Sequence, residues 1–403
     1  RDFGLFAAVG MMLAWLLTMA VCTAALARWE IPLPPRTPRA RLLDRLLAAP
    51  ARAMPARRRE VLVGAVALSL LLLGGVARMR VDTHPMELLP RGHVVRTDGA
   101  WIERNAGFYT PLEFVVRAPD AGRLRSPEML ARLREWQRRA ERRVEVGRSW
   151  GVADVIGVPG DAAAYLSPDG REGRVTAYVR MTSTRGFAST IRALERNGAE
   201  LLGEGVSLRA AGYLPLYLRI TDYVVVGTAW GLGLALLVVF ALLALALRSV
   251  ALTAAAVAVN LLPVLLVFGT MGWAGIPLDI ATATIGAIVL GIAVDDSIHL
   301  LVRFRAERRR GRGPRRAMTR ALRGAGRAVV LSSLVLGAGF GVLALCGSPS
   351  IAYFGVMGGL AIAGALLADL LLLPALLIPR RTARAGVPRP PLLAVRTPQE
   401  VGA

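Results

Sequence analysis

The chain has 403 residues, of which 54% are hydrophobic, and it carries a formal net charge of +22. Its mean hydropathy of +0.49 is typical of a polytopic membrane protein with a soluble portion and argues against an ordinary globular enzyme. The basic residues are all arginine and gather at the ends of hydrophobic runs, as in cytoplasmic loops, so we expect no nucleic-acid partner.

The sequence lacks the patterns of cofactor and catalytic sites. Cys22 and Cys346 lie in or beside apolar runs without metal-ligand spacing, so we expect neither a disulfide framework nor a metal site. We find no Walker-type phosphate loop and no Ser/His/Asp arrangement, and therefore expect a protein that is not an enzyme and needs no cofactor. The chain starts with Arg1 instead of Met and shows no signal-peptide pattern, which predicts that it is part of a longer polypeptide.

The N-terminal part contains two predicted membrane spans separated by a cytoplasmic linker. Residues 1–29 hold an apolar run of spanning length, and residues 61–77 hold a second, uncharged one. The linker, residues 30–60, is rich in Pro and Arg. Within it, Ala40 to Ala48 repeats apolar residues at helical spacing. This pattern predicts an amphipathic helix on the inner membrane surface, and an ordinary linker helix fits it equally well.

Residues 78–218 are polar and charged, and predict an extracytoplasmic α+β domain large enough for its own core. The predicted elements are a strand, a helix, two strands, a helix and a strand, at Pro111–Arg117, Ser126–Arg143, Trp150–Ile156, Arg174–Met181, Ser189–Leu202 and Val206–Ala211. Ser126 is the expected N-cap of the first helix. This order of elements is that of the split βαβ, ferredoxin-like unit.

Residues 219–379 predict a bundle of five further membrane helices, and residues 380–403 a cytoplasmic tail. The expected spans are Tyr223–Leu247, Val250–Gly272, Leu278–Val302, Ala328–Gly347 and Ile351–Ile378. Their connectors alternate between basic and uncharged. Placing the basic connectors inside puts the soluble domain outside and the C-terminus in the cytoplasm. The fold class is therefore an α-helical polytopic membrane protein with seven spans and one extracytoplasmic α+β domain.

Two adjacent carboxylates, Asp295 and Asp296, lie within one apolar run. An ionisable side chain at membrane depth costs about 2.5–3.5 kcal/mol on insertion, so it usually faces a protein interior and marks an ion or proton path. At a rise of about 1.5 Å per residue, Asp295, Asn260 and Asp369 lie roughly 12–18 Å from the basic ends of three helices. We expect these three side chains to converge.

Further polar residues share this region. His299 lies one turn after the carboxylates on the same face, and Thr284 is almost in phase with Asp295. Burial and a neighbouring carboxylate both favour the protonated form of a carboxyl group, as a proton-coupling site requires. The sequence predicts a proton relay of Asp295, Asp296, Asp369 and His299, supported by Asn260, Thr284, Ser297, Ser332 and Ser333.

Structural interpretations of the same residues stay open. The adjacent aspartates could brace helices through hydrogen bonds, a helix-end role suits His299 better than a relay, and Asp369 could be a structural hydrogen-bond partner. The small residues at 337–341 and 355–359 predict close helix packing. Asp279, beside Pro277, is expected to be an N-cap at the outer surface.

The run from Gly291 to Arg305, with its core Gly-Ile-Ala-Val-Asp-Asp-Ser-Ile-His, resembles the fourth-helix signature of the resistance–nodulation–division (RND) superfamily, in its MMPL-type and predicted exporter branch. Residues 275–284, 326–333 and 368–377 resemble the neighbouring helices. The resemblance covers the membrane part well. In the soluble domain it depends on placement, although residues 82–90 resemble the beginning of that family's domain.

The resemblance implies that the chain holds the last helix of a first repeat, the linker and all of a second repeat, and that the missing N-terminal repeat of the same polypeptide is a partner. It implies a secondary transporter of the bacterial cytoplasmic (inner) membrane, driven by proton influx, that exports lipids or other hydrophobic compounds. Asp295 would be the proton-carrying carboxylate by position. Many members have Asp-Tyr where this chain has Asp295-Asp296.

Two other functions fit the same scaffold. One is a membrane lipid-binding or sensing protein in the manner of sterol-sensing domains, and the other is a protein-translocation accessory of the SecD/SecF kind. The soluble domain is too short for an added module that docks on an outer-membrane channel. The sequence names no substrate and is compatible with a homo-oligomer.

Overall fold

A computed structural model describes residues 2–28, 38–156 and 162–379. The chain divides into two compact units, residues 1–46 and 47–403. The first unit consists of helix α1 (Asp2–Arg28) and the beginning of α2 (Pro38–Val76). The predicted cytoplasmic tail at 380–403 and the linker residues 29–37 lie outside the described residues.

The part of the chain that the structure describes contains seven helices long and apolar enough to cross a membrane. They are α1, α2, α8 (Tyr213–Leu247), α9 (Val250–Ala274), α11 (Ile285–Arg309), α12 (Pro314–Ala344) and a last helix from Pro349 to Leu377. The last helix is divided into α13 (Pro349–Leu367), a π-helical turn (Ala368–Leu372) and α14 (Leu373–Leu377). The number of predicted spans and the polytopic class are confirmed.

Several predicted helix boundaries are wrong. The amphipathic helix and the following span form the single helix α2, which accommodates Pro50 and Pro55. Helix α8 begins at Tyr213, ten residues before the predicted start. Helices α11 and α12 extend into the basic connector and leave only residues 310–313 between them. Hydropathy marks the apolar part of a helix, whereas arginine and alanine are good helix formers that continue it into water.

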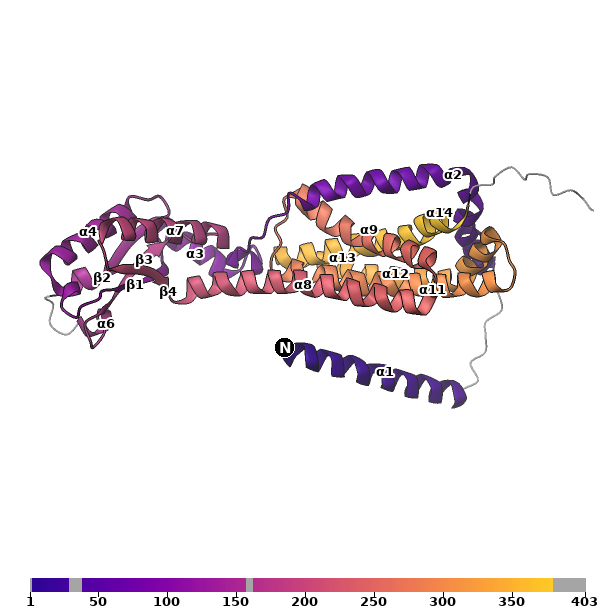
Figure 1. Ribbon diagram of the computed structural model, residues 1–403, viewed down its shortest axis with the longest axis horizontal. Coiled ribbons are helices and arrows are strands. Elements are labelled where there is room, and N and C mark those ends of the chain that lie inside the picture. The colour runs from indigo at the N-terminus through magenta and orange to yellow at the C-terminus, as the bar shows by residue number, and fades with distance from the viewer. Residues whose placement is uncertain (1, 29–37, 157–161, 380–403) are drawn as a thin grey trace, which may run out of the picture. The chain divides into compact units, whose positions relative to one another are not determined.

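The α/β domain lies between α2 and α8 in the chain and contains one four-stranded sheet. Its strands are β1 (Thr110–Arg117), β2 (Val146–Gly151), β3 (Glu172–Val179) and β4 (Ser207–Ala211). They are arranged in the order β2-β3-β1-β4, and every neighbouring pair is antiparallel. The longer helices are α4 (Pro127–Glu141) and α7 (Thr184–Leu201), which lie along the sheet (Figure 1).

The core of this domain joins the sheet to both long helices. Trp136 of α4 is fully buried, and its ring lies edge-on against Phe114 of β1 with centroids 5.3 Å apart. The indole Nε1 of Trp136 donates to the carbonyl oxygen of Leu194 on α7 at 3.0 Å. The shorter helices are η1 (Pro85–Leu88), α3 (Val94–Asn105), η2 (Arg123–Arg125), α5 (Val152–Val155), α6 (Ala162–Tyr165) and, in the membrane bundle, α10 (Ile280–Ala283).

Two local predictions in the domain have opposite outcomes. Ser126 is the N-cap of α4, as predicted, and its side chain accepts a hydrogen bond from the amide of Met129. The strand predicted at Trp150–Ile156 is wrong, because β2 ends at Gly151 and the chain turns into α5. The Asp154 carboxylate causes this turn, since it accepts hydrogen bonds from the Gly151 amide at 2.8 Å and from Gln137 at 2.7 Å.

The first residues of the domain are attached to the membrane helices at two loops. Val81 pairs with Leu278, which precedes α10, in an isolated parallel bridge. The Ser348 hydroxyl, before α13, donates to the carbonyl oxygen of Leu88 at 2.9 Å. The Asp82 carboxylate accepts from the Thr184 hydroxyl at 2.9 Å and so holds the same segment against α7. The domain is thus attached at the end of the bundle that carries the uncharged connectors.

Glycines allow the closest contacts between bundle helices. A Cβ added to Gly355 of α13 would lie 2.2 Å from the backbone nitrogen of Ala344 on α12, and one added to Gly358 would meet the Phe340 ring. The predicted packing role is therefore confirmed at these two glycines. It is wrong for the glycines at 337, 339 and 341, where an added Cβ meets no atom of the described residues within 4 Å.

The substitution Gly355→Ala should destabilise the bundle, whereas Gly337→Ala should not. The atoms that the new methyl group of Gly355→Ala would meet are backbone atoms of α12, so the two helices must separate, at a cost of about 1–3 kcal/mol. Gly337→Ala adds a methyl group in open space and improves helix propensity. Thermal unfolding of the two purified variants in detergent tests this, and equal midpoints would contradict the observed packing.

Candidate functional site

Three helical segments place a hydrogen-bonded polar cluster in the apolar interior of the bundle. Asn260 comes from α9, Ser297 from α11, and Asp369 from the π-helical turn. Asn260 and Ser297 are 0% exposed and Asp369 is 1% exposed. The Ser297 hydroxyl lies 2.8 Å from Asp369 Oδ1 and 3.2 Å from Asn260 Oδ1. We call these three residues the buried cluster.

The buried cluster places one donor, the Ser297 hydroxyl, between two acceptor oxygens. The Asn260 Nδ2 group donates to the Ala256 carbonyl at 2.8 Å, which orients the amide so that its oxygen faces Ser297. Ser297 has one hydroxyl proton and two acceptors within reach, so it can serve only one of them at a time. Asp369 Oδ2 is buried and has no hydrogen-bond partner among the described residues. A proton on Asp369 would let it donate to Ser297, which would then donate to Asn260.

The backbone around the buried cluster is irregular on two helices. Asp369 lies in the π-helical turn Ala368–Leu372, and Pro374 follows within α14. On α9, Pro263 comes one turn after Asn260. A proline cannot donate to the carbonyl four residues earlier, and single π-helical turns within α-helices are frequent at functional sites. Both helices can therefore adjust locally beside the cluster.

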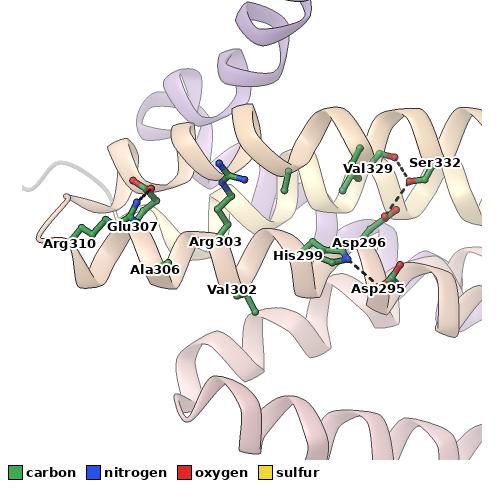
Figure 2. A pocket seen from close by; sticks show the side chains of 12 residues that line it. Asp295, Asp296, His299, Val302, Arg303, Ala306, Glu307, Arg310, Val329 and Ser332 are labelled. Atoms are coloured by element: carbon green, nitrogen blue, oxygen red, sulfur yellow. Dashed lines mark hydrogen bonds and ion pairs between the residues drawn. The ribbon is translucent and has the colours of Figure 1, made fainter. Parts of the chain in front are cut away.

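Asp296 lies next to the buried cluster on α11 and faces α12. It is 8% exposed, and its carboxylate oxygens lie 3.4 Å from the Ser332 hydroxyl and 3.5 Å from the Ser333 hydroxyl. Figure 2 shows the Asp296 side chain directed toward Ser332. These contacts are long, and Ser332 also donates to the Val329 carbonyl at 2.9 Å. Asp296 precedes Ser297, whose hydroxyl contacts Asp369.

Asp295 and His299 lie on another face of α11. The His299 Nε2 atom is 3.6 Å from Asp295 Oδ1, and the two side chains are 68% and 74% exposed. The expectation that Asp295 converges with Asn260 and Asp369 is therefore wrong. Neighbouring residues on a helix point about 100° apart, so the residues that follow Asp295 take the interior position. Depth along a helix does not specify which face a residue occupies.

The remaining predicted polar residues lie at the other end of α11. Thr284 is exposed and marks the break between α10 and α11. Asp279 is the N-cap of α10, as predicted, and accepts from the Thr282 amide at 2.7 Å. It is 7% exposed rather than on the surface, and its second oxygen accepts from the Ser350 hydroxyl of α13 at 2.8 Å.

A cavity of about 720 Å³ connects the carboxylate pair with the basic end of α11. Asp295, Asp296 and Ser332 line one part of it, and Glu307 and Arg310 line the other (Figure 2). It can admit water to Asp296 from the basic end of the bundle.

Glu307 also lines this cavity, and the sequence pattern did not single it out as a candidate site residue. It is 6% exposed and forms ion pairs with Arg310, Arg312 and Arg320. Its signal in the sequence is the single acidic residue among the arginines that follow Phe304.

Comparisons with known proteins identify relatives. The profile of the MMPL family matches residues 112–391. A stretch of 122 residues, 29% of the chain, is 39% identical to the membrane protein MJ1562 of Methanocaldococcus jannaschii and covers 31% of that protein. A stretch of 96 residues, 24% of the chain, is 36% identical to MmpL11 of Mycobacterium leprae, named as a probable transport protein, and covers 10% of it. The matched region is thus less than a third of each relative.

The substitution Ser297→Ala should destabilise the bundle more than Ser332→Ala does. Removing the Ser297 hydroxyl leaves two fully buried oxygen atoms, on Asn260 and Asp369, without a partner, at a cost of about 1–3 kcal/mol. Ser332 is partly exposed and its contact with Asp296 is longer, so its loss should cost less. Thermal unfolding of both variants measures the difference, and a larger effect at Ser332 would contradict the importance of the buried cluster.

Proposed function

This chain belongs to the MMPL family, and we propose that it forms part of a proton-driven secondary transporter of the RND type that exports lipids or other hydrophobic compounds. The observation that supports proton coupling best is the fully buried cluster of Asn260, Ser297 and Asp369 beside Asp296. Enclosing a carboxyl group at membrane depth costs free energy, and the carboxyl groups found there usually mark an ion or proton path. The transport role of the family and the name of MmpL11 support the transporter assignment.

Asp296 and Asp369 are the proposed proton carriers, in place of the expected Asp295. Asp296 faces the cavity that extends to the basic end of the bundle, so water in this cavity can exchange protons with it. Asp369 is enclosed behind Ser297, and a proton on its Oδ1 atom would be held by donation to the Ser297 hydroxyl. Transfer between the two carboxyl groups would move a proton between the cavity and the closed interior.

Coupling to movement would come from the hydroxyl groups of α12. An ionised Asp296 attracts the hydroxyls of Ser332 and Ser333, which at 3.4 and 3.5 Å have room to move closer. A neutral Asp296 binds them less strongly. The charge of one carboxyl group thus biases the position of α12 against α11, and the π-helical turn at Ala368–Leu372 gives the last helix room to follow.

Asp295 and His299 would act at the edge of this path. Their side chains are mostly exposed on this chain, and ionisable groups at membrane depth need protein or water around them. We propose that the N-terminal repeat implied by the resemblance covers this face. His299 lines the cavity and would exchange protons between water and the carboxylate pair.

The α/β domain would be an extracytoplasmic, ferredoxin-like substrate domain. The strand order β2-β3-β1-β4, with all neighbours antiparallel and a helix after β1 and after β3, supports this fold. The basic connectors after α8 and α11 lie at the ends of the helices opposite to the domain, which supports a cytoplasmic location for those ends in a bacterial inner membrane.

Asn substitutions of the three aspartates in the full-length protein test the assignment. In proteoliposomes with an imposed proton gradient, Asp296→Asn and Asp369→Asn should each reduce proton flux on the order of 100-fold, because a carboxamide cannot carry the proton. Asp295→Asn is the matched control on the adjacent, exposed position and should retain more flux. Thermal unfolding would confirm that each variant is folded.

Unchanged flux in folded Asp296→Asn and Asp369→Asn variants would overturn proton coupling through this cluster. The carboxyl groups would then be helix braces, and lipid binding without transport would be the better assignment.

A further inference from the structure

The turn between α8 and α9 has an unusual residue at its first position. Arg248 is the C-cap of α8 with φ 44° and ψ 39°, and it is the one non-glycine residue with positive φ in the part of the chain that the structure describes. This left-handed conformation is unfavourable for a side chain with a Cβ, and glycine is the usual residue there. The equivalent C-cap of α9 is indeed Gly275, with φ 68°. The turn alone would favour glycine at position 248, so the arginine side chain is expected to have a separate role.

The Arg248 side chain lies at the mouth of an apolar groove. A cavity of about 710 Å³ extends between α8 and α9, and alanine and valine side chains such as Ala244, Ala254 and Val257 form most of its walls. The Thr253 hydroxyl in the wall already donates to the Ser249 carbonyl at 3.0 Å. Arg248 is therefore the charged group of the groove, and its guanidinium makes no hydrogen bond or ion pair with any described residue.

A second positive charge lies beside the mouth of the groove. Arg305 of α11 donates from its guanidinium to the carbonyl oxygen of Ala246 at 2.9 Å, two residues before Arg248. Both arginines lie at the basic end of the bundle, near the C-terminal ends of α8 and α11. The groove thus combines mostly apolar walls with the cation of Arg248 in its lining, and Arg305 binds the same end of α8.

We propose that this groove binds an anionic phospholipid of the adjacent leaflet, with an acyl chain between α8 and α9 and the phosphate on Arg248. A guanidinium binds phosphate oxygens in pairs, and basic pockets between membrane helices bind acidic head groups. A protein helix in the same groove would need an acidic side chain at this position to pair with the guanidinium, whereas an anionic phospholipid carries its phosphate next to its acyl chains. The site is separate from the buried cluster, and it does not depend on the proposed transport function.

The substitution Arg248→Gly distinguishes a lipid site from a turn residue. Glycine removes the cation and relieves the left-handed strain, so the variant should be at least as stable as the wild type in phosphatidylcholine nanodiscs. Its binding of phosphatidylglycerol, measured by native mass spectrometry of the full-length protein, should weaken about fivefold. The added thermal stability that phosphatidylglycerol gives the wild type should shrink accordingly.

Two further variants complete the test. Arg316→Gln removes an exposed positive charge at the same end of the bundle, on α12, and should leave phosphatidylglycerol binding within experimental error. Ala254→Phe fills the groove without changing charge and should also weaken binding. If Arg248→Gly and Ala254→Phe bind phosphatidylglycerol as the wild type does, or if Arg316→Gln weakens binding as much as Arg248→Gly, the proposed site is overturned.

Discussion

Polar groups in the apolar interior of the bundle are stable only where hydrogen-bond partners meet them, and this constraint organises the bundle. Asn260, Ser297 and Asp369 come from three segments far apart in the sequence and hydrogen bond in a fully buried position. Their meeting requires α9, α11 and the last helix to be neighbours with particular faces inward. The glycine contacts between α12 and α13 and the π-helical turn allow the close approach that this arrangement needs.

The same constraint separates two residues that are adjacent in the sequence. Asp296 is 8% exposed and faces the serines of α12, whereas the Asp295 side chain is 74% exposed and faces His299. Because successive helix positions point about 100° apart, the two carboxylates face different surroundings although they remain neighbours. Asp296 therefore faces the interior of this chain, and Asp295 faces its outer surface.

The two ends of the bundle differ in chemistry. Uncharged loops at one end attach to the first residues of the α/β domain through Leu278 and Ser348. At the other end, arginines surround the buried Glu307, and Arg248 stands at the mouth of an apolar groove. The cavity that Asp296 lines extends to the charged end, which is the end where we propose proton exchange and contact with acidic lipid head groups.

Local patterns of hydropathy, alternation and capping were enough to predict seven candidate spans, the alternation of four strands with two long helices in the domain, and the caps at Ser126 and Asp279. It also indicated that polar residues on three helices lie at one depth. The packing of the helices was needed to show that Asp296, and not Asp295, faces the interior. It was also needed to show that Gly355, and not Gly337, makes a close contact with a neighbouring helix. Sequence spacing gives height along a helix, whereas the rotation of each helix is set by the neighbours against which it packs.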